Sequence, residues 1–321
     1  MKRFMHFWAL WMLMLAGARS FGQEGMPVYY DYFADNFYLV HPALAGAGTC
    51  SKVRYTGRMQ WMGVKDFPML HTISLSTHLG KKSGFGIMAY NDRNGYHHQT
   101  GMQVTFAHHI TLSEGEKINK LSFGLSALMA LNRFNTTPVD PHDPAGGMVK
   151  ESGTYFNMDV GMSYHYANFF LILTAKNFLP LRQAFQQDTV PVSLRNFIFH
   201  TGLVTGGKSR FHLEPSLFVQ YKDYYGDLIA DVNLKAYHDL QNGSFFYGLS
   251  YRNYLNTMSG QPLQDFTPVI GFYAGKFFAA YLYTYQLSPT TFSNGGFHQI
   301  SLGYNFDCRP HVYRYACPHL Q

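Results

Sequence analysis

The sequence alternates between apolar and polar residues with a period of two, and residues 297–306, FHQISLGYNF, show this most clearly. From His298 to Phe306 every second residue is an aromatic, an aliphatic or a histidine, and the residues between them are polar or small. This period is that of a β-strand with one apolar and one polar face. Such a strand lies half-buried in a soluble β-domain, or it faces lipid in an outer-membrane barrel whose last strand closes onto the first.

The same alternation recurs along the chain and predicts about fourteen strands. The clearest is TYFNMDVGMSYHY, residues 154–166, in which polar residues and glycine separate the apolar ones. The others lie near 53–61, 72–79, 84–89, 102–110, 121–131, 169–176, 195–205, 211–222, 228–236, 244–251, 268–274, 276–285 and 297–306. An even number is typical of bacterial outer-membrane barrels. Pro215 falls inside one strand and has no N–H to donate, so we expect a bulge there.

The connections between these segments sort by length. One alternate set is short: 80–83, 113–119, 167–168, 206–209, 240–243 and 275. The long connections, 134–153, 178–194, 252–267 and 286–296, all fall in the other set. Outer-membrane barrels have short periplasmic turns and longer outer loops, whereas a soluble sandwich has no reason to sort its loops this way. The sequence therefore predicts an all-β fold, a transmembrane antiparallel β-barrel of about 14 strands over residues 51–306.

Composition and the N-terminus agree with export to a membrane. Charged residues make up 14% of the chain and aromatic residues 17%, a balance suited to a lipid-facing wall with aromatic girdles. Residues 1–22 combine basic Lys2 and Arg3 with an apolar run and then small residues, which predicts a cleaved signal peptide. Cleavage changes the count from 25 basic and 19 acidic residues to 22 and 19, so nucleic-acid binding is not indicated. We expect the protein in the cell outer membrane of a Gram-negative bacterium, surrounded by lipid.

The segments that flank the predicted barrel have no strand pattern. Residues 23–50 are rich in aromatics and turn at His41–Pro42, and we interpret them as an N-terminal periplasmic arm or as a plug inside the barrel. Residues 307–321 form a short, basic C-terminal tail, which we expect to be periplasmic because it follows the last strand. An oxidising compartment favours disulfides. We predict that Cys308 pairs with Cys317, with Cys50 free or paired elsewhere.

The inward faces of the predicted strands carry ionisable residues of both signs. They are Arg54, Arg58, Asp159, His165, His212, Glu214, Asp231 and Lys235. We interpret them as a lumen charge network, because charge pairs in a confined interior order one another; the alternative is that they line water. No catalytic, metal-binding or phosphate-binding motif is found, and no small-molecule substrate is evident. We expect no enzyme activity, no cofactor and no bound metal.

Several stretches together resemble the PorP/SprF family of type IX secretion system outer-membrane proteins of Bacteroidetes. They are NFYLVHPALAG (36–46), RMQWMG (58–63), GFGIMAYNDRNGY (84–96), KLSFGLSA (120–127), and HQISLGYNFDCRP (298–310) with the final ACP (316–318). The family-motif positions in the arm are His41, Pro42, Ala43 and Gly46. His41 stands where the family usually has asparagine.

The resemblance implies a barrel without enzyme activity that helps the type IX system export or display cargo such as adhesins, some of them linked to gliding. The implied partners are the C-terminal domains of the cargo or the translocation machinery. The barrel size and polar lumen alone also allow a different function, that of an outer-membrane porin or specific diffusion channel. A third hypothesis, an outer-membrane hydrolase, needs a Ser and a His aligned on neighbouring strands.

Overall fold

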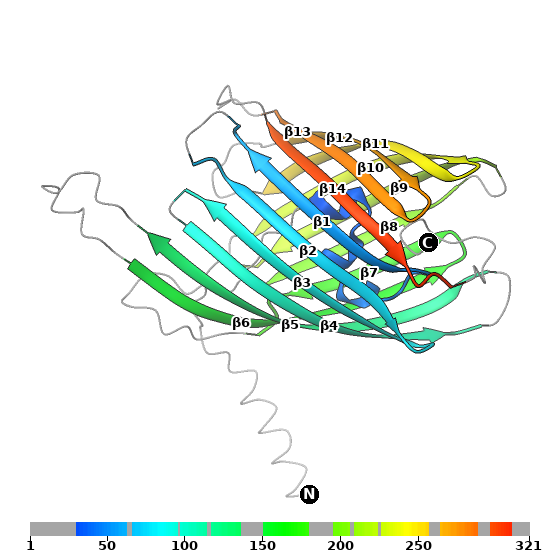
Figure 1. The fold of residues 1–321 in the computed structure, drawn as a ribbon, viewed down its shortest axis with the longest axis horizontal. Helices are drawn as coiled ribbons and strands as arrows, with labels where there is room; N and C mark the ends of the chain where they lie inside the picture. The colour runs from blue at the N-terminus through cyan, green and yellow to red at the C-terminus, as the bar shows by residue number, and fades with distance from the viewer. Residues whose placement is uncertain are drawn as a thin grey trace, which may run out of the picture.

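The computed structural model describes residues 30–62, 66–95, 97–113, 117–135, 150–179, 195–205, 209–223, 226–256, 264–287 and 296–309. Within them, fourteen antiparallel strands form one closed barrel in which each strand pairs with its neighbours in sequence (Figure 1). β14 pairs with β1 over the full length of both strands, with Tyr55 opposite Leu302, and this pairing closes the wall. The prediction of a barrel of about 14 antiparallel strands is confirmed.

The strands are β1 (Ser51–Gln60), β2 (Met69–Leu79), β3 (Ser83–Asn94), β4 (His97–Thr111), β5 (Asn119–Asn135), β6 (Lys150–Tyr166), β7 (Phe169–Lys176), β8 (Asn196–Leu203), β9 (Phe211–Lys222), β10 (Asp227–Leu240), β11 (Gly243–Asn256), β12 (Gln264–Ala274), β13 (Phe277–Gln286) and β14 (Phe297–Phe306). Three short 3-10 helices precede them: η1 (Tyr30–Ala34), η2 (Phe37–Leu39) and η3 (Pro42–Leu44).

The outer face of the wall is apolar. Ile73, Phe106 and Met129 point outward and are 54%, 52% and 60% exposed. Soluble monomers rarely expose a continuous apolar surface of this extent, so the face is one that contacts lipid. No helix in the described ranges is long and apolar enough to cross a membrane.

The two rims of the barrel differ. β1 begins and β14 ends at one rim, where the connections 80–82, 167–168, 241–242 and 275–276 are short. The longest connections, 136–149 and 177–195, leave from the opposite rim, together with the short connections 95–96 and 223–226. We call these the short-loop rim and the long-loop rim.

The bulge expected at Pro215 is not formed. The register between β9 and β10 runs straight through Leu234 opposite Pro215. The ladder on the other side of β9 is interrupted instead: its last regular pair is Gly202 of β8 opposite Ser216, and pairing resumes in the same register at the Thr205–Leu213 bridge. The physical reason is that the missing N–H of proline removes a ladder hydrogen bond on one side of the strand only.

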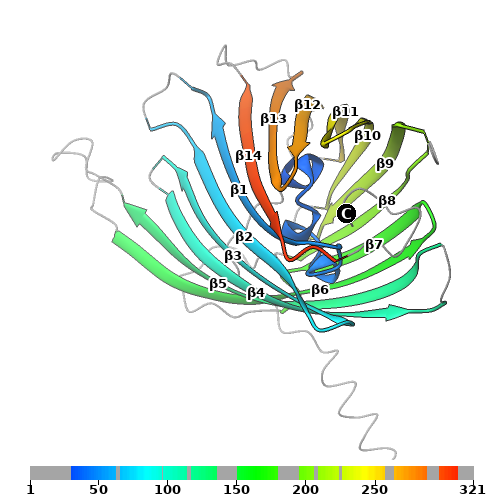
Figure 2. The ribbon, with the colours of Figure 1, turned by 45° about the vertical axis from the view of Figure 1, so that its right-hand side comes forward.

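The interior contains an apolar core in addition to the polar side chains that alternation predicts. Inward-facing Ile172, Phe218, Phe246 and Leu282 are at most 1% exposed. They pack against aromatic and aliphatic residues of the arm, which runs inside the barrel from Tyr30 onward (Figures 1 and 2). The arm thus supplies the apolar surface that these inward residues bury, and together they fill the lumen.

Candidate functional site: the filled lumen

The arm is folded by a proline, a glycine and an aspartate at its turns. His41 is extended, as the residue before a proline prefers, and Pro42 opens η3 with its φ already suited to a helix start. Gly46 has φ +60°, and its N–H donates to Ser76 Oγ on β2 at 2.8 Å. Asp35 has φ 101°, an uncommon conformation for a residue with a side chain, and its carboxylate is held by an ion pair with the wall.

Inward glycines of the wall leave room for the arm. A methyl group added at Gly124 on β5 would overlap the backbone of Pro42 and Ala43. One added at Gly84 on β3 would overlap the carbonyl group of Ala45. Backbone atoms can approach so closely only where the wall residue has no Cβ. These glycines lie in two of the stretches that carry the family resemblance, GFGIMAYNDRNGY and KLSFGLSA.

Tyr38 shows the same fit at a side chain. Its ring lies where a methyl group on Gly86 would be, and its hydroxyl group donates to Thr105 Oγ1 on β4 at 3.0 Å. Asn36 Nδ2 donates to Ser74 Oγ on β2 at 3.1 Å. The arm is therefore matched to the wall in shape and in hydrogen bonds.

His41 is a buried, neutral anchor of the arm inside the barrel. Its Nδ1 lies 2.9 Å from Thr174 Oγ1, and its Nε2 lies 3.1 Å from His200 Nδ1, so that one imidazole donates to the other. The His200 ring in turn stacks on Phe37, with centroids 5.0 Å apart. Burial, with a smaller effect of Lys176, lowers the pKa of His41 to about 3, because the charged ring would lose its hydration.

Tyr32 joins the arm to a buried ion pair. Its hydroxyl group donates to Asp231 Oδ2 at 2.6 Å, and Arg252 binds the two oxygens of that carboxylate at 2.6 and 2.7 Å. Burial and the Asp231 charge raise the pKa of Tyr32 well above its usual range, so the hydroxyl group keeps its proton and donates it. The ring of Tyr32 stacks on Phe218, with centroids 4.4 Å apart.

Two further buried pairs stand beside the arm. Lys235 Nζ lies 3.1 Å from Glu214 Oε1 and 5.3 Å from the centre of the Phe37 ring, close enough for a cation–π contact. Lys176 Nζ lies 3.1 Å from Asp159 Oδ2. Each of these four charged groups has its counter-charge, which is the condition for a charge to remain inside a protein.

Wall side chains also donate to main-chain carbonyl groups of the arm. Four such bonds are present: Lys176 to Leu39 O at 3.4 Å, His109 to Ala45 O at 3.0 Å, Lys120 to Ala47 O at 2.9 Å and His78 to Gly48 O at 2.6 Å. A segment of short 3-10 turns leaves many carbonyl groups without a partner of its own. The wall supplies those partners, so the arm can be buried in this conformation.

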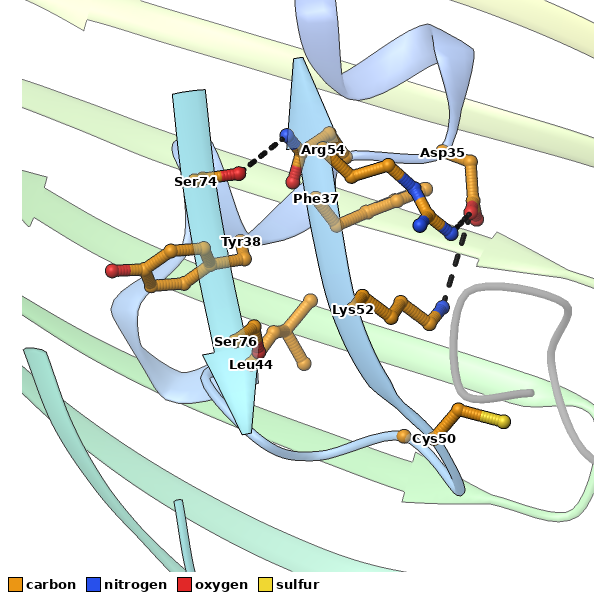
Figure 3. Close-up of a pocket in the computed structure, with 11 residues that line it drawn as sticks. Asp35, Phe37, Tyr38, Leu44, Cys50, Lys52, Arg54, Ser74 and Ser76 are labelled. Carbon is orange, nitrogen blue, oxygen red and sulfur yellow. Dashed lines mark hydrogen bonds and ion pairs between the residues drawn. The ribbon is translucent and has the colours of Figure 1, made fainter. Parts of the chain in front are cut away.

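A polar pocket separates the arm from β1 and β2 (Figure 3). Asp35 of the arm and the cations Lys52 and Arg54 of β1 face one another across it, with Nζ–Oδ2 and Nη2–Oδ2 distances of 3.8 and 3.3 Å. Arg54 also lies over the Phe278 ring, 4.8 Å from its centre. These contacts make the pocket a further attachment point of the arm.

Seven of the eight residues predicted for the lumen charge network are buried inside the barrel. They are Arg54, Arg58, Asp159, His165, Glu214, Asp231 and Lys235, each at most 7% exposed. Five of them fall in four separate ion pairs: Arg54 with Asp35, Asp159 with Lys176, Glu214 with Lys235, and Asp231 with Arg252. Arg58 lies over the Phe297 ring and His165 lies against the Phe170 ring. His212 lies apart from them at the short-loop rim, 3.1 Å from Asp239.

Two essential partners were missed from the sequence. Arg252 falls in a segment that the sequence assigned to a long connection, whereas β11 continues to Asn256. Lys176 ends an apolar strand that gave no clear inward face. Strand pairing, which sequence alternation does not reveal, brings them to Asp231 and Asp159.

The predicted disulfide between Cys308 and Cys317 is wrong. Cys308 is bonded to Cys50, with an S–S distance of 2.05 Å, and Cys317 lies outside the described residues. Closure of the barrel is the reason, because the start of β1 and the end of β14 meet at the same rim, where Ser51 is opposite Phe306. The bond covalently joins the end of the arm to the end of the chain's last strand.

The described residues contain no group of three or more His, Cys, Asp or Glu side chains that could hold a metal ion. Three of the buried histidines, His41, His109 and His200, form hydrogen bonds to hydroxyl, carbonyl and imidazole groups. The arrangement is suited to holding a segment of the chain in place.

A closed barrel with a lipid-facing wall defines this chain as an outer-membrane β-barrel protein. It belongs to a family described as type IX secretion system membrane protein PorP/SprF, whose profile matches residues 22–304. The predicted family is thus confirmed. No curated protein matches the sequence.

The solved structures to which the chain is similar are outer-membrane barrels. The monoaromatic hydrocarbon channel CymD has 12% identity and a TM-score of 0.48 over 87% of this chain and 94% of that one. A Pseudomonas aeruginosa FadL homologue has 9% identity and a TM-score of 0.45 over 84% and 94%. CdiB from Acinetobacter baumannii has 10% identity and a TM-score of 0.43 over 80% of this chain, which spans 60% of the length of CdiB.

Proposed function

We propose that this protein is a non-enzymatic outer-membrane component of the type IX secretion system with a closed lumen. It supports the export or surface display of cargo such as adhesins by binding the cargo or the translocation machinery at its rims. Family membership supports the role in secretion. The observation that carries the closed lumen is the arm, which fills the barrel and is tied to the last strand by Cys50–Cys308.

A diffusion channel is the competing function, and the contacts of the arm weigh against it. A solute could pass only if the arm left, and leaving would expose the apolar side chains of three buried clusters. It would also strip the Asp231–Arg252 pair of the Tyr32 hydrogen bond. Each loss costs free energy, so the resting protein stays closed.

Extraction of the tagged protein from its own outer membrane in mild detergent, followed by mass spectrometry, tests the binding role. We expect secretion-machinery subunits or a secreted adhesin to accompany the wild type. An untagged strain and an unrelated tagged barrel serve as controls. Recovery of the protein alone, together with an unchanged secreted proteome in a deletion strain, would refute the role in secretion.

Planar-bilayer recording tests the closed lumen separately. The wild type should give no steady single-channel conductance, whereas a variant lacking residues 30–47 should conduct. Steady conductance of the wild type, in a sample whose arm resists added protease and is therefore still docked, would favour the diffusion channel over the closed lumen.

A further inference from the structure

Three cationic or imidazole side chains form a row across neighbouring strands near the long-loop rim. Arg93 of β3 is opposite His98 of β4, and His98 is opposite Arg133 of β5. All three face outward, because they share the parity of exposed Ala89, Met102 and Met129 on the same strands. With strands about 4.8 Å apart, the two arginines are about 10 Å from each other with His98 between them.

No carboxylate among the described residues pairs with this row. The outward neighbours in register are Met69 on β2 and Ser152 on β6, and Asp92 lies on the inward parity, opposite buried Gln99. The Nε atom of Arg93 is buried with no hydrogen-bond partner in the described structure. Two guanidinium groups about 10 Å apart on one face therefore have no counter-charge in register with them in the described part of the wall.

Another arginine at the same rim shows the usual arrangement. Arg195 precedes β8, and its Nη2 and Nε lie 2.9 and 3.1 Å from Asp223 Oδ2. It is partly exposed like Arg93, yet it has its own carboxylate. Exposure alone therefore does not explain the unpaired arginines of β3 and β5.

The row lies at the depth of lipid headgroups. The last apolar outward residues on its strands are Ala89, Met102 and Leu131, two to four positions before the row. Two to four residues correspond to about 7–13 Å along a strand, or about 5–10 Å along the membrane normal at a tilt of about 40°. Headgroups occupy roughly the first 5–8 Å outside the hydrocarbon.

We propose that Arg93, His98 and Arg133 bind the phosphate group of a membrane lipid at the long-loop rim. Phosphate supplies the negative charge and the several acceptor oxygens that two guanidinium groups and an imidazole can share. The lipid is held beside the apolar face of β3 to β5, so its acyl chains lie along the wall while its headgroup meets the row. This site is independent of the role in secretion proposed above.

Native mass spectrometry of the detergent-purified protein, titrated with phosphatidic acid, tests the site. We expect the wild type to retain the lipid and the Arg93→Gln/Arg133→Gln variant to bind it about 30-fold more weakly, at about 1 kcal/mol for each cation near a membrane surface. Arg195→Gln is the matched control and should bind as the wild type does. Phosphatidylcholine, whose phosphate is shielded by choline, should bind weakly to the wild type, to the double variant and to the Arg195→Gln control.

Three outcomes would overturn the proposal. They are equal retention of phosphatidic acid by the double variant, an equal loss in the Arg195→Gln control, and binding of inorganic phosphate with no binding of phosphatidic acid. The last would assign the row to a free anion. An unchanged heat-modifiable mobility on gels establishes that each variant is folded before it is compared.

Discussion

The substitution Gly124→Ala tests whether the wall is shaped for the arm. The new methyl group would overlap the backbone of Pro42 and Ala43, so η3 must retreat by about 1 Å to reach ordinary van der Waals separation. Backbone cannot rotate away as a side chain can, and the whole turn must therefore move. The β5 strand itself tolerates alanine, because its ladder and its outward face are unaffected.

The expected magnitude follows from the bonds that hold this turn and the residues next to it. A shift of this size breaks or stretches three of them, each worth about 1 kcal/mol, so docking weakens by about 3 kcal/mol. Because 1.4 kcal/mol is a factor of ten, the arm should open about 100-fold more often. The bonds join His41 to Thr174, His109 to Ala45, and Lys120 to Ala47.

Hydrogen–deuterium exchange of the protein in nanodiscs measures this opening directly. Amides within residues 40–47, such as those of Val40 and Leu44, are bonded within the arm and should exchange about 100-fold faster in the variant. Gly57→Ala is the control, because the nearest atoms to its methyl group would be those of the exposed Tyr55 side chain, from 3.1 Å, and not the backbone of the arm. Unchanged exchange in residues 40–47, or equal acceleration in β4 and β5, would refute a wall built around the arm.

The remaining predictions concern charge, pH and the covalent link. Asp231→Asn leaves the buried Arg252 guanidinium without its counter-charge. We expect the unfolding free energy, measured by urea denaturation in detergent, to fall by about 3–5 kcal/mol. A fall of less than about 1 kcal/mol would contradict a buried ion pair. His41 has a pKa of about 3 when docked and 6.5 ordinarily, so the undocked arm takes up the proton first. Docking should therefore weaken as pH falls from about 6.5 towards 3, seen as faster arm exchange after correction for intrinsic rates, and His41→Gln should reduce this dependence. Cys50→Ser removes the disulfide and should lower the unfolding free energy by about 2–5 kcal/mol. In the denatured wild type, Cys50 and Cys308 should resist thiol labelling until a reductant is added. Labelling of either cysteine before reduction would disprove the disulfide.

The wall of the barrel could be predicted from local sequence patterns alone. Alternation at a period of two is a local property, because each strand must present one face to lipid and the other to the interior. The pattern from Phe297 to Phe306 therefore predicted β14 without any knowledge of distant contacts, and its pairing with β1 followed once the loop lengths favoured a barrel. The sorting of connections into two rims follows from the same up-and-down topology.

The contents of the lumen, in contrast, became visible only in the folded barrel. Barrel closure brings Cys50 to Cys308 across 258 residues, and it places Gly124 beneath the turn at Pro42. Neither contact leaves a periodic signal, because it joins segments whose separation in the chain is unrelated to strand spacing. Phe218 is likewise an apolar residue on the inward, otherwise polar face of its strand, and its stacking on Tyr32 of the arm explains it. The inward side chains are shaped by their contacts with the arm. The arm itself has no secondary-structure period, so its position could not be inferred from the sequence.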